Sequence, residues 1–240
     1  MAELVKRDFF GTRGQTVQFH PAVTYEDFVV GLGPQVDGQA LSFRVKKGWL
    51  LEAAREAASG PFLLVIDEVN RADLGKVLGE AIYLFEPGEV GGASARRVEL
   101  THEVDGRRTF CFPENLYVLA TMNTADRSIA GMDLAVRRRF AFMTLMPARQ
   151  VLVEQNCSEA ALDAFDWLTD VFVEFAPDDA LSLMPGHSYF MAKTDEELRA
   201  RLRYELLPLV DEYLRQGFLA QASSELSSVR DRLDDLSRES

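Results

Sequence analysis

The sequence is poor in the residues that mark secreted, membrane-spanning or metal-binding proteins. Its 240 residues include two cysteines, Cys111 and Cys157, and three histidines that lie far apart. Two cysteines suggest no disulfide framework and fit a reducing cytoplasm, and the histidines lack the spacing of a structural metal site. No apolar run approaches the length of a membrane span, and the first ten residues carry four charges instead of an apolar signal-peptide core. We therefore expect a cytoplasmic protein without a membrane segment.

Basic charge is also scarce. The chain has 26 Lys and Arg against 38 Asp and Glu, a formal net charge of −12. From residue 148 onward nine basic side chains face 19 acidic ones, a net charge of −10, which leaves −2 for residues 1–147. Such an acidic C-terminal part argues against a protein that wraps nucleic acid by itself. If a nucleic acid is the target, we expect another domain or subunit to read it.

The stretch 61–73 predicts a buried strand that ends in two carboxylates. The apolar run Phe62–Ile66 follows Gly60-Pro61, as in strands of parallel sheets that helices cover on both faces. Ligands of such sheets bind beyond the carboxyl ends of the strands, where Asp67 and Glu68 stand. Asp67 is suited to hold Mg²⁺ through its water shell, and Glu68 to polarise an attacking water. The alternative is a core strand followed by a solvated acidic turn.

A second buried strand with polar residues at its end is predicted within 116–128. Its first polar side chain is Asn123, whose amide can orient a water beside a γ-phosphate. Three arginines, Arg137 to Arg139, then precede the apolar run Phe140–Leu145, which predicts the last core strand. Arginines are rarely buried unpaired. The cluster therefore favours an arginine finger that acts on the phosphates of a neighbouring subunit.

Four stretches of the chain carry a family resemblance. They are Ile66–Ala72, Met122–Ser128, Arg137–Phe140 and Gly186–Phe190. Together they resemble the McrB group of AAA+ NTPases, the GTP-driven motors of modification-dependent restriction systems. Gln18–Pro21 with Tyr25–Phe28 is also similar to a segment of that group. The resemblance covers about residues 15 to 215; its Asn-Thr-Ala-Asp stretch is specific to this branch, whereas the Asp-Glu strand is shared by its relatives.

The resemblance implies an α/β fold of the P-loop NTPase AAA+ type, with a parallel sheet, followed by an all-α lid. We expect an incomplete core over 1–147, a helical lid over 148–220 and an amphipathic tail over 221–240. The tail either folds back on the lid or meets a partner helix.

The same resemblance implies the roles of the site residues. The catalytic group would comprise Glu68, Asn123, Arg138 and Arg139, and the nucleotide would contact Asp67, Asp126, Arg127 and His187, with Asp67 as the Mg²⁺ ligand. His187 has an alternative, a histidine that is hydrogen-bonded in the lid core. The implied cofactors are Mg²⁺ and GTP or ATP. The implied partners are identical subunits in a ring, expected to be a hexamer, a McrC-like nuclease subunit and, indirectly, DNA.

One motif of the family is missing. No Gly-x-x-x-x-Gly-Lys-Ser/Thr run, whose backbone N–H groups and lysine bind phosphates, occurs in these residues. In the family this loop comes just ahead of the strand that holds Gln18, and the sheet order is 5-1-4-3-2. The first strand and the loop are therefore expected to be absent, which leaves a slot beside the Asn123 strand. The missing piece lies on another chain, or the sequence is a truncated product or fragment.

Helical spacing and turn residues predict the remaining elements. Hairpins are expected around Asp37-Gly38 and around Asp105-Gly106. The first would face the ring's pore in the family; the alternative is a surface loop. Helices are predicted by apolar spacing, capping residues and Gly or Pro stops. Their ranges are 25–30, 49–58, 73–85, 132–139, 158–176 and 194–217, the last with a kink at Pro208.

Three functions fit these residues. The first is a GTP- or ATP-hydrolysing ring motor. The second is a non-hydrolysing ring scaffold that supplies Arg138 or Arg139 to a neighbour. The third is a MoxR-like ATPase that remodels proteins. The branch resemblance favours GTP for the first of them.

Overall fold

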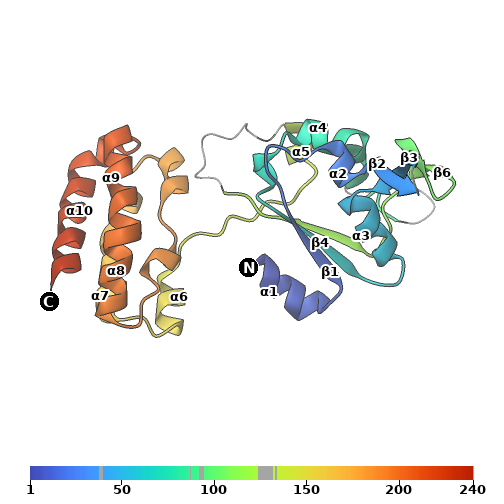
Figure 1. Cartoon of the computed structure of the whole chain (residues 1–240). Helices are drawn as coiled ribbons and strands as arrows, with labels where there is room; N and C mark the ends of the chain where they lie inside the picture. Colours follow the sequence, from blue (N-terminus) through green and yellow to red (C-terminus); the bar gives the residue numbers. More distant parts are fainter. Residues whose placement is uncertain (38–39, 87, 92–94, 124–131, 133, 240) are drawn as a thin grey trace. The chain divides into compact units, whose positions relative to one another are not determined.

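The chain forms two compact units, Met1–Phe142 and Met143–Ser240 (Figure 1). The structure is a computed structural model, which describes all residues except 38–39, 87, 92–94, 124–131, 133 and 240. The first unit is α/β and the second is helical. The predicted fold class, an α/β core with a parallel sheet followed by helices, is therefore confirmed.

A three-stranded parallel sheet forms the centre of the first unit. The strands are β1 (Gly14–Gln18), β4 (Phe62–Asp67) and β7 (Leu116–Ala120), in the order β1-β4-β7. Gln18 pairs with Asp67 and Ile66 pairs with Ala120, so the three strands end at the same edge. This order corresponds to the 4-3-2 part of the expected sheet.

The middle strand is buried on both faces, as its unbroken apolar run predicts. Phe62, Leu64 and Ile66 belong to the main core, and Leu63 and Val65, which alternate with them, are equally buried on the opposite face. This burial on both faces fixes the position of β4 and of the residues that directly follow it.

Two antiparallel hairpins lie together at one end of this unit (Figure 1). The first joins β2 (Val30–Asp37) to β3 (Ala40–Lys47), and the second joins β5 (Val98–Val104) to β6 (Arg107–Phe110). The second turn places Asp105 at φ 51° and Gly106 at φ 76°, the paired positive angles of a tight hairpin turn. Both predicted hairpins are confirmed. Val30, predicted as helix, is instead the first residue of β2.

Short helices surround the sheet. The Thr24 side chain and Asp27 form the predicted reciprocal cap of α2. The helix predicted over 73–85 begins as an α-helix and continues as a 3₁₀ helix, Gly79–Phe85. The change occurs at Gly79, whose φ is 50°. The α-helices of this unit are α1 (Ala2–Val5), α2 (Tyr25–Phe28), α3 (Trp49–Ala57), α4 (Leu74–Leu78) and α5 (Leu134–Arg137).

The last core strand predicted over Phe140–Leu145 does not form, and this prediction is wrong. Phe140 packs against Phe85 with ring centroids 5.2 Å apart, but the residues after it have no regular structure. Phe142 and Leu145 are 45% and 59% exposed. A strand needs a neighbour to pair with, and in the described part of the chain β7 pairs only with β4. The apolar run therefore remains outside the sheet.

The second unit consists of helices that pack side by side (Figure 1). Thr194 caps α8 through Glu197 N–H, and a π-helical turn, Leu202–Leu206, leads into α9 one residue ahead of the predicted kink at Pro208. Gly217, in the left-handed region, ends α9 as predicted. The α-helices are α6 (Arg149–Glu154), α7 (Glu159–Asp170), α8 (Asp195–Arg201), α9 (Leu207–Gln216) and α10 (Ser223–Arg238).

The C-terminal helix folds back onto the other helices of its unit. Arg230 Nε lies 2.9 Å from Asp211 Oδ1 of α9, and the Arg232 guanidinium lies 3.5 Å from the centre of the Trp167 ring of α7. Leu226 and Leu233 are fully buried. Of the two expected positions for the tail, the structure has the one that folds back.

Candidate functional site

Thr121 joins the ends of the two strands that the sequence singles out. Its hydroxyl donates to Asp67 Oδ1 and accepts from the Glu68 backbone N–H at 3.2 Å. The Val69 N–H donates to the Thr121 carbonyl at 2.9 Å, and the Thr121 N–H donates to Ile66 O at 2.9 Å. The acidic pair is thus fixed to the carboxyl end of β7 by side chain and backbone together.

Glu68 has an unusual backbone conformation. Its φ of 53° and ψ of 44° place a non-glycine residue in the left-handed region. Such residues cost about 1–3 kcal/mol and are concentrated at functional sites, where the surrounding structure holds them. The half-buried carboxylate lies 2.7 Å from Arg71 Nε through its Oε2. Glu68 is therefore directed at the sheet edge by a strained turn and engaged by a nearby cation.

Asn123 comes to the same edge as the acidic pair. Asn70 donates from Nδ2 to the Asn123 carbonyl at 3.1 Å, and the Asn123 side chain is exposed. Asn70 Oδ1 is buried and has no hydrogen-bond partner in the part of the chain that the structure describes. The structure therefore brings Asp67, Glu68 and Asn123 together, as predicted from the strand ends. Asp126 and Arg127 lie outside the described residues.

The arginine cluster divides into exposed and buried members. Arg139 has a 2% exposed side chain, its Nε lies 3.2 Å from Glu86 Oε2, and its Nη1 donates to Ala135 O. Its guanidinium also stands 5.4 Å from the centre of the Tyr83 ring. Arg138 is exposed. This packing favours Arg138 over Arg139 for contact with a neighbouring subunit, because Arg139 is engaged within its own unit.

His187 belongs to the second unit, where it starts a 3₁₀ turn, His187–Phe190. Its ring is half-buried, and Nδ1 has no hydrogen-bond partner among the residues that the structure describes. The alternative, a histidine that is hydrogen-bonded in the lid core, is therefore not supported at Nδ1. Its role in nucleotide sensing stays a prediction.

The first 140 residues match a known domain family. A model described as the AAA domain of the dynein-related subfamily matches residues 1–140, more than half of the chain. The chain belongs to this family. The McrB-type character of the AAA domain, expected from the motifs, is confirmed by its relatives.

Two curated relatives of this AAA domain are components of restriction enzymes by name. The "Type IV methyl-directed restriction enzyme EcoKMcrB subunit" of Escherichia coli (strain K12) is 31% identical over 221 residues, which cover 84% of this chain and 47% of that protein. The "Type II restriction enzyme BsuMI component YdiS" of Bacillus subtilis (strain 168) is 30% identical over 89 residues, 34% of this chain and 26% of that protein. The chain spans less than half the length of either relative.

A solved structure shows only a distant similarity. It is a candidate ATPase from Cytophaga hutchinsonii that covers 91% of this chain and 67% of its own length, with 13% identity and a TM-score of 0.35. No helix in the described part of the AAA chain is long and apolar enough to cross a membrane.

The acidic pair of this AAA domain fits a magnesium ion that is shared with a nucleotide. Among the described residues no group of three or more His, Cys, Asp or Glu is placed to hold a metal by itself. Mg²⁺ is ordinarily held by one or two carboxylates together with phosphates and water. Asp67 meets this requirement, since the Thr121 hydroxyl fixes one of its oxygens at the edge where a nucleotide would lie.

Sequence reasoning missed three residues that shape this AAA site. Thr121 orients both acids, Asn70 bonds to the Asn123 backbone, and Arg71 pairs with Glu68. Thr121 could have been found, because a hydroxyl directly after a buried strand can reach the neighbouring strand end. Arg71 could have been found too, since a cation three residues after Glu68 is within reach in a helical turn.

Proposed function

We propose that this AAA domain takes part in the hydrolysis of a nucleoside triphosphate, GTP or ATP, as a McrB-like component of a restriction system. The observation that carries the proposal is the Thr121 hydroxyl between Asp67 Oδ1 and the Glu68 N–H. It holds the Asp67 carboxylate and the Glu68 backbone at the carboxyl edge of a parallel sheet, where nucleotides bind in this class of fold. The resemblance to GTP-driven motors favours GTP.

Each residue of the edge has a separate role in this proposal. Asp67 holds the ion, which supplies neutralisation of phosphate charge when bound. Glu68 accepts a proton from the attacking water, for which its position at the end of a strained turn is suited. The exposed Asn123 amide orients the same water beside the γ-phosphate. Asp126, Arg127 and His187 are proposed to contact the nucleotide, and loss of nucleotide affinity in His187→Ala would test the last of these.

Residues 1–240 do not include the phosphate-binding motif of the family. The sequence contains no Gly-x-x-x-x-Gly-Lys-Ser/Thr run, and such loops supply much of the affinity for nucleotide. The lid half is also strongly acidic and repels an anion. Residues 1–240 expressed alone should therefore bind nucleotide weakly or not at all.

Isothermal titration tests this statement directly. GTP and ATP would be titrated with Mg²⁺ into the chain as given and into the same chain joined to a loop-bearing N-terminal segment. We expect binding and turnover only in the joined protein, with Glu68→Gln as the inactive control. If the joined protein turns over no nucleotide, the proposal of hydrolysis is wrong.

We further propose a ring of identical subunits, a hexamer, in which the exposed Arg138 acts on the nucleotide of a neighbour. The curated relatives carry the names of restriction-enzyme components, which supports a McrC-like nuclease as partner and DNA that is read by another domain or subunit. A cytoplasmic location agrees with these partners.

A second candidate is a ring scaffold that does not hydrolyse nucleotide. The exposure of Arg138 supports it. It predicts that this chain stimulates turnover by an intact relative and that Arg138→Ala abolishes the stimulation. Mixing experiments with a hydrolysis-competent relative distinguish it from the first candidate.

A further inference from the structure

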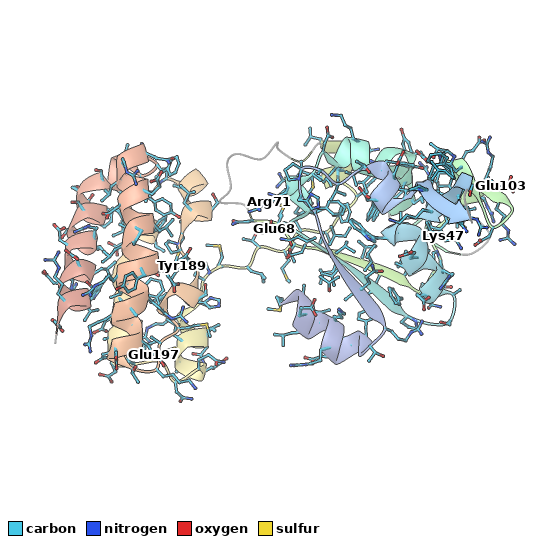
Figure 2. All side chains as sticks on the ribbon, in the orientation of Figure 1. Lys47, Glu68, Arg71, Glu103, Tyr189 and Glu197 are labelled. Carbon is cyan, nitrogen blue, oxygen red and sulfur yellow. The ribbon has the colours of Figure 1, made fainter. Side chains whose placement is uncertain are left out.

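The first unit contains a cavity of about 480 Å³ at the end opposite the acidic pair. Figure 2 shows Lys47 and Glu103 at that end and Glu68 and Arg71 at the other. The cavity lies between α3 and the β5–β6 hairpin, with the last residue of β3 at its border. Its apolar wall includes Leu51, Leu100, Val104 and Phe110.

The cavity is electropositive in a chain that is otherwise acidic. Among the described residues, four cations line it, Lys47, Arg55, Arg97 and Arg107, together with one carboxylate, Asp105; outside the lining, Glu56 lies 3.3 Å from Arg55. The whole chain has a net charge of −12, of which −2 belongs to residues 1–147, where the cavity lies. Concentrated positive charge over an apolar wall is complementary to a ligand that has carboxylates or phosphates on an apolar body.

An exposed apolar stripe leads to this cavity along β3. Leu41, Phe43 and Val45 alternate along the strand and share one face, with exposures of 66%, 64% and 41%. Leu32 of β2, which pairs with Val45, is 46% exposed and extends the stripe. Lys47 is the next residue in the same alternation, so the stripe ends at a cation that borders the cavity.

We propose that the β3 stripe and the cavity bind one extended, acidic segment of a partner protein. Apolar side chains of the segment would cover Leu41, Phe43 and Val45, and an apolar anchor with flanking carboxylates would enter the cavity. This proposal goes beyond the nucleotide chemistry and does not depend on it, because none of the residues belongs to the acidic edge.

The walls favour a peptide over a nucleic acid. Single-stranded nucleic acids bind through cations combined with aromatic faces on which bases stack. Phe110 is the one aromatic residue among the described lining residues, and its ring already packs against Phe112 at 6.1 Å and 73°. The other apolar part of the wall is aliphatic, Leu51, Ala54, Leu100 and Val104, which suits the side chain of an apolar anchor.

Asp105 neutralises part of the positive charge of the cavity in the free protein. Its Oδ2 lies 2.5 Å from Lys47 Nζ, and it stands in the turn of the β5–β6 hairpin at φ 51°. An acidic ligand must compete with Asp105 for Lys47. Removal of this carboxylate should therefore strengthen binding of the ligand, a gain that a folding defect would not produce.

The ligand class is tested by selection from a random dodecapeptide library displayed on phage, with the full chain as bait. We expect enrichment of peptides that combine acidic residues with large apolar ones. Failure to enrich any peptide over an unrelated bait, or enrichment of neutral or basic peptides, would overturn the proposal.

Binding of a selected peptide is then measured by fluorescence anisotropy with variants of the cavity. Arg55→Glu with Arg107→Glu should weaken binding about tenfold or more. Arg108→Glu is the matched control, since Arg108 neighbours Arg107 on β6 and does not line the cavity. Asp105→Asn should tighten binding of the peptide about threefold, because the carboxylate that competes for Lys47 is removed. Asparagine tolerates the same positive φ, so the turn should be kept.

Three outcomes of these measurements would contradict the proposal. They are an equal loss in Arg108→Glu, no gain in Asp105→Asn, and displacement of the peptide by an oligothymidylate of the same length. Cys111, which lines the cavity, gives an independent readout. Bound peptide should slow its reaction with a maleimide and leave Cys157, in the second unit, unchanged.

Discussion

Arg71 Nε lies 2.7 Å from Glu68 Oε2 and holds the glutamate that is proposed to activate water. The two side chains are 44% and 28% exposed, so the pair should add less than about 1 kcal/mol to stability. Its main effect is on the direction of the Glu68 carboxylate.

Arg71→Gln, in the protein joined to a phosphate-binding loop, should raise basal nucleotide turnover a few-fold, because Glu68 is released to approach water. Turnover and thermal unfolding would be measured together. Lys76→Gln is the matched control, since Lys76 pairs with Asp73 at the same i,i+3 spacing and 2.9 Å. A fall in turnover in Arg71→Gln would show that Arg71 assists the reaction.

Asp67 and Glu68 should differ when each is changed in the same joined protein. Asp67→Ala should weaken metal-dependent nucleotide binding, because the ion loses its protein anchor. Glu68→Gln should retain binding and stop hydrolysis, because only the proton acceptor is lost. Calorimetric titration and phosphate release measure the two effects. Normal turnover in Glu68→Gln would remove Glu68 from its assigned role.

Thr121→Val should disturb both acids although the side-chain volume hardly changes. The variant removes the donor to Asp67 Oδ1 and the acceptor of the Glu68 N–H, so the free energy of unfolding should fall by about 1–3 kcal/mol. Thr121→Ser keeps the hydroxyl and is the control. Urea unfolding of the two variants provides the comparison, and equal stabilities would show that the hydroxyl contributes little.

Substitution of Arg139 should lower stability, whereas substitution of Arg138 should affect activity. Arg139→Ala leaves Glu86 without its buried cation and should lower the free energy of unfolding by about 3 kcal/mol. Arg138→Ala should change it by less than about 0.5 kcal/mol and abolish stimulation of a neighbouring subunit. Unfolding curves and mixed-subunit turnover measure the two effects. Stimulation that survives Arg138→Ala would exclude it as the finger.

Tyr25 should make the first unit sensitive to alkali. Burial, and then the hydrogen bond that its hydroxyl donates to Glu80, raise the pKa of Tyr25 from 10.0 to about 12. Between those values the unfolded chain has lost the proton and the folded chain keeps it, so stability present below pH 10 falls as pH rises. Tyr25→Phe should flatten this part of the pH dependence of urea unfolding. An unchanged slope would exclude Tyr25 as its source.

Local patterns predicted most of the elements. An apolar run bounded by Gly60-Pro61 was enough for β4, because a strand buried on both faces needs no alternation. Thr24 with Asp27, and Asp105 with Gly106, each encode a cap or a turn within a few residues. The meeting of Asp67 and Asn123 also followed, since parallel strands end at one edge.

The rest depended on contacts between residues distant in sequence. Burial of Arg139 is possible because Glu86 stands beside it, and the sequence gives no sign of that pairing. The apolar run Phe140–Leu145 has the composition of a strand, yet strand formation also requires a hydrogen-bonding neighbour. Propensity alone could not supply that neighbour.

The hydrogen bonds at Thr121 also restrain how the sheet can slip. Any sliding of β7 along β4 must break the bonds that Thr121 makes to Ile66, Glu68 and Val69 at once. A slip by one residue would also turn every side chain of the strand to the other face. Force applied along β7 is therefore carried by the bonds that hold the acidic pair in place as well as by the β4–β7 ladder, so a displacement of this strand would disturb Asp67 and Glu68.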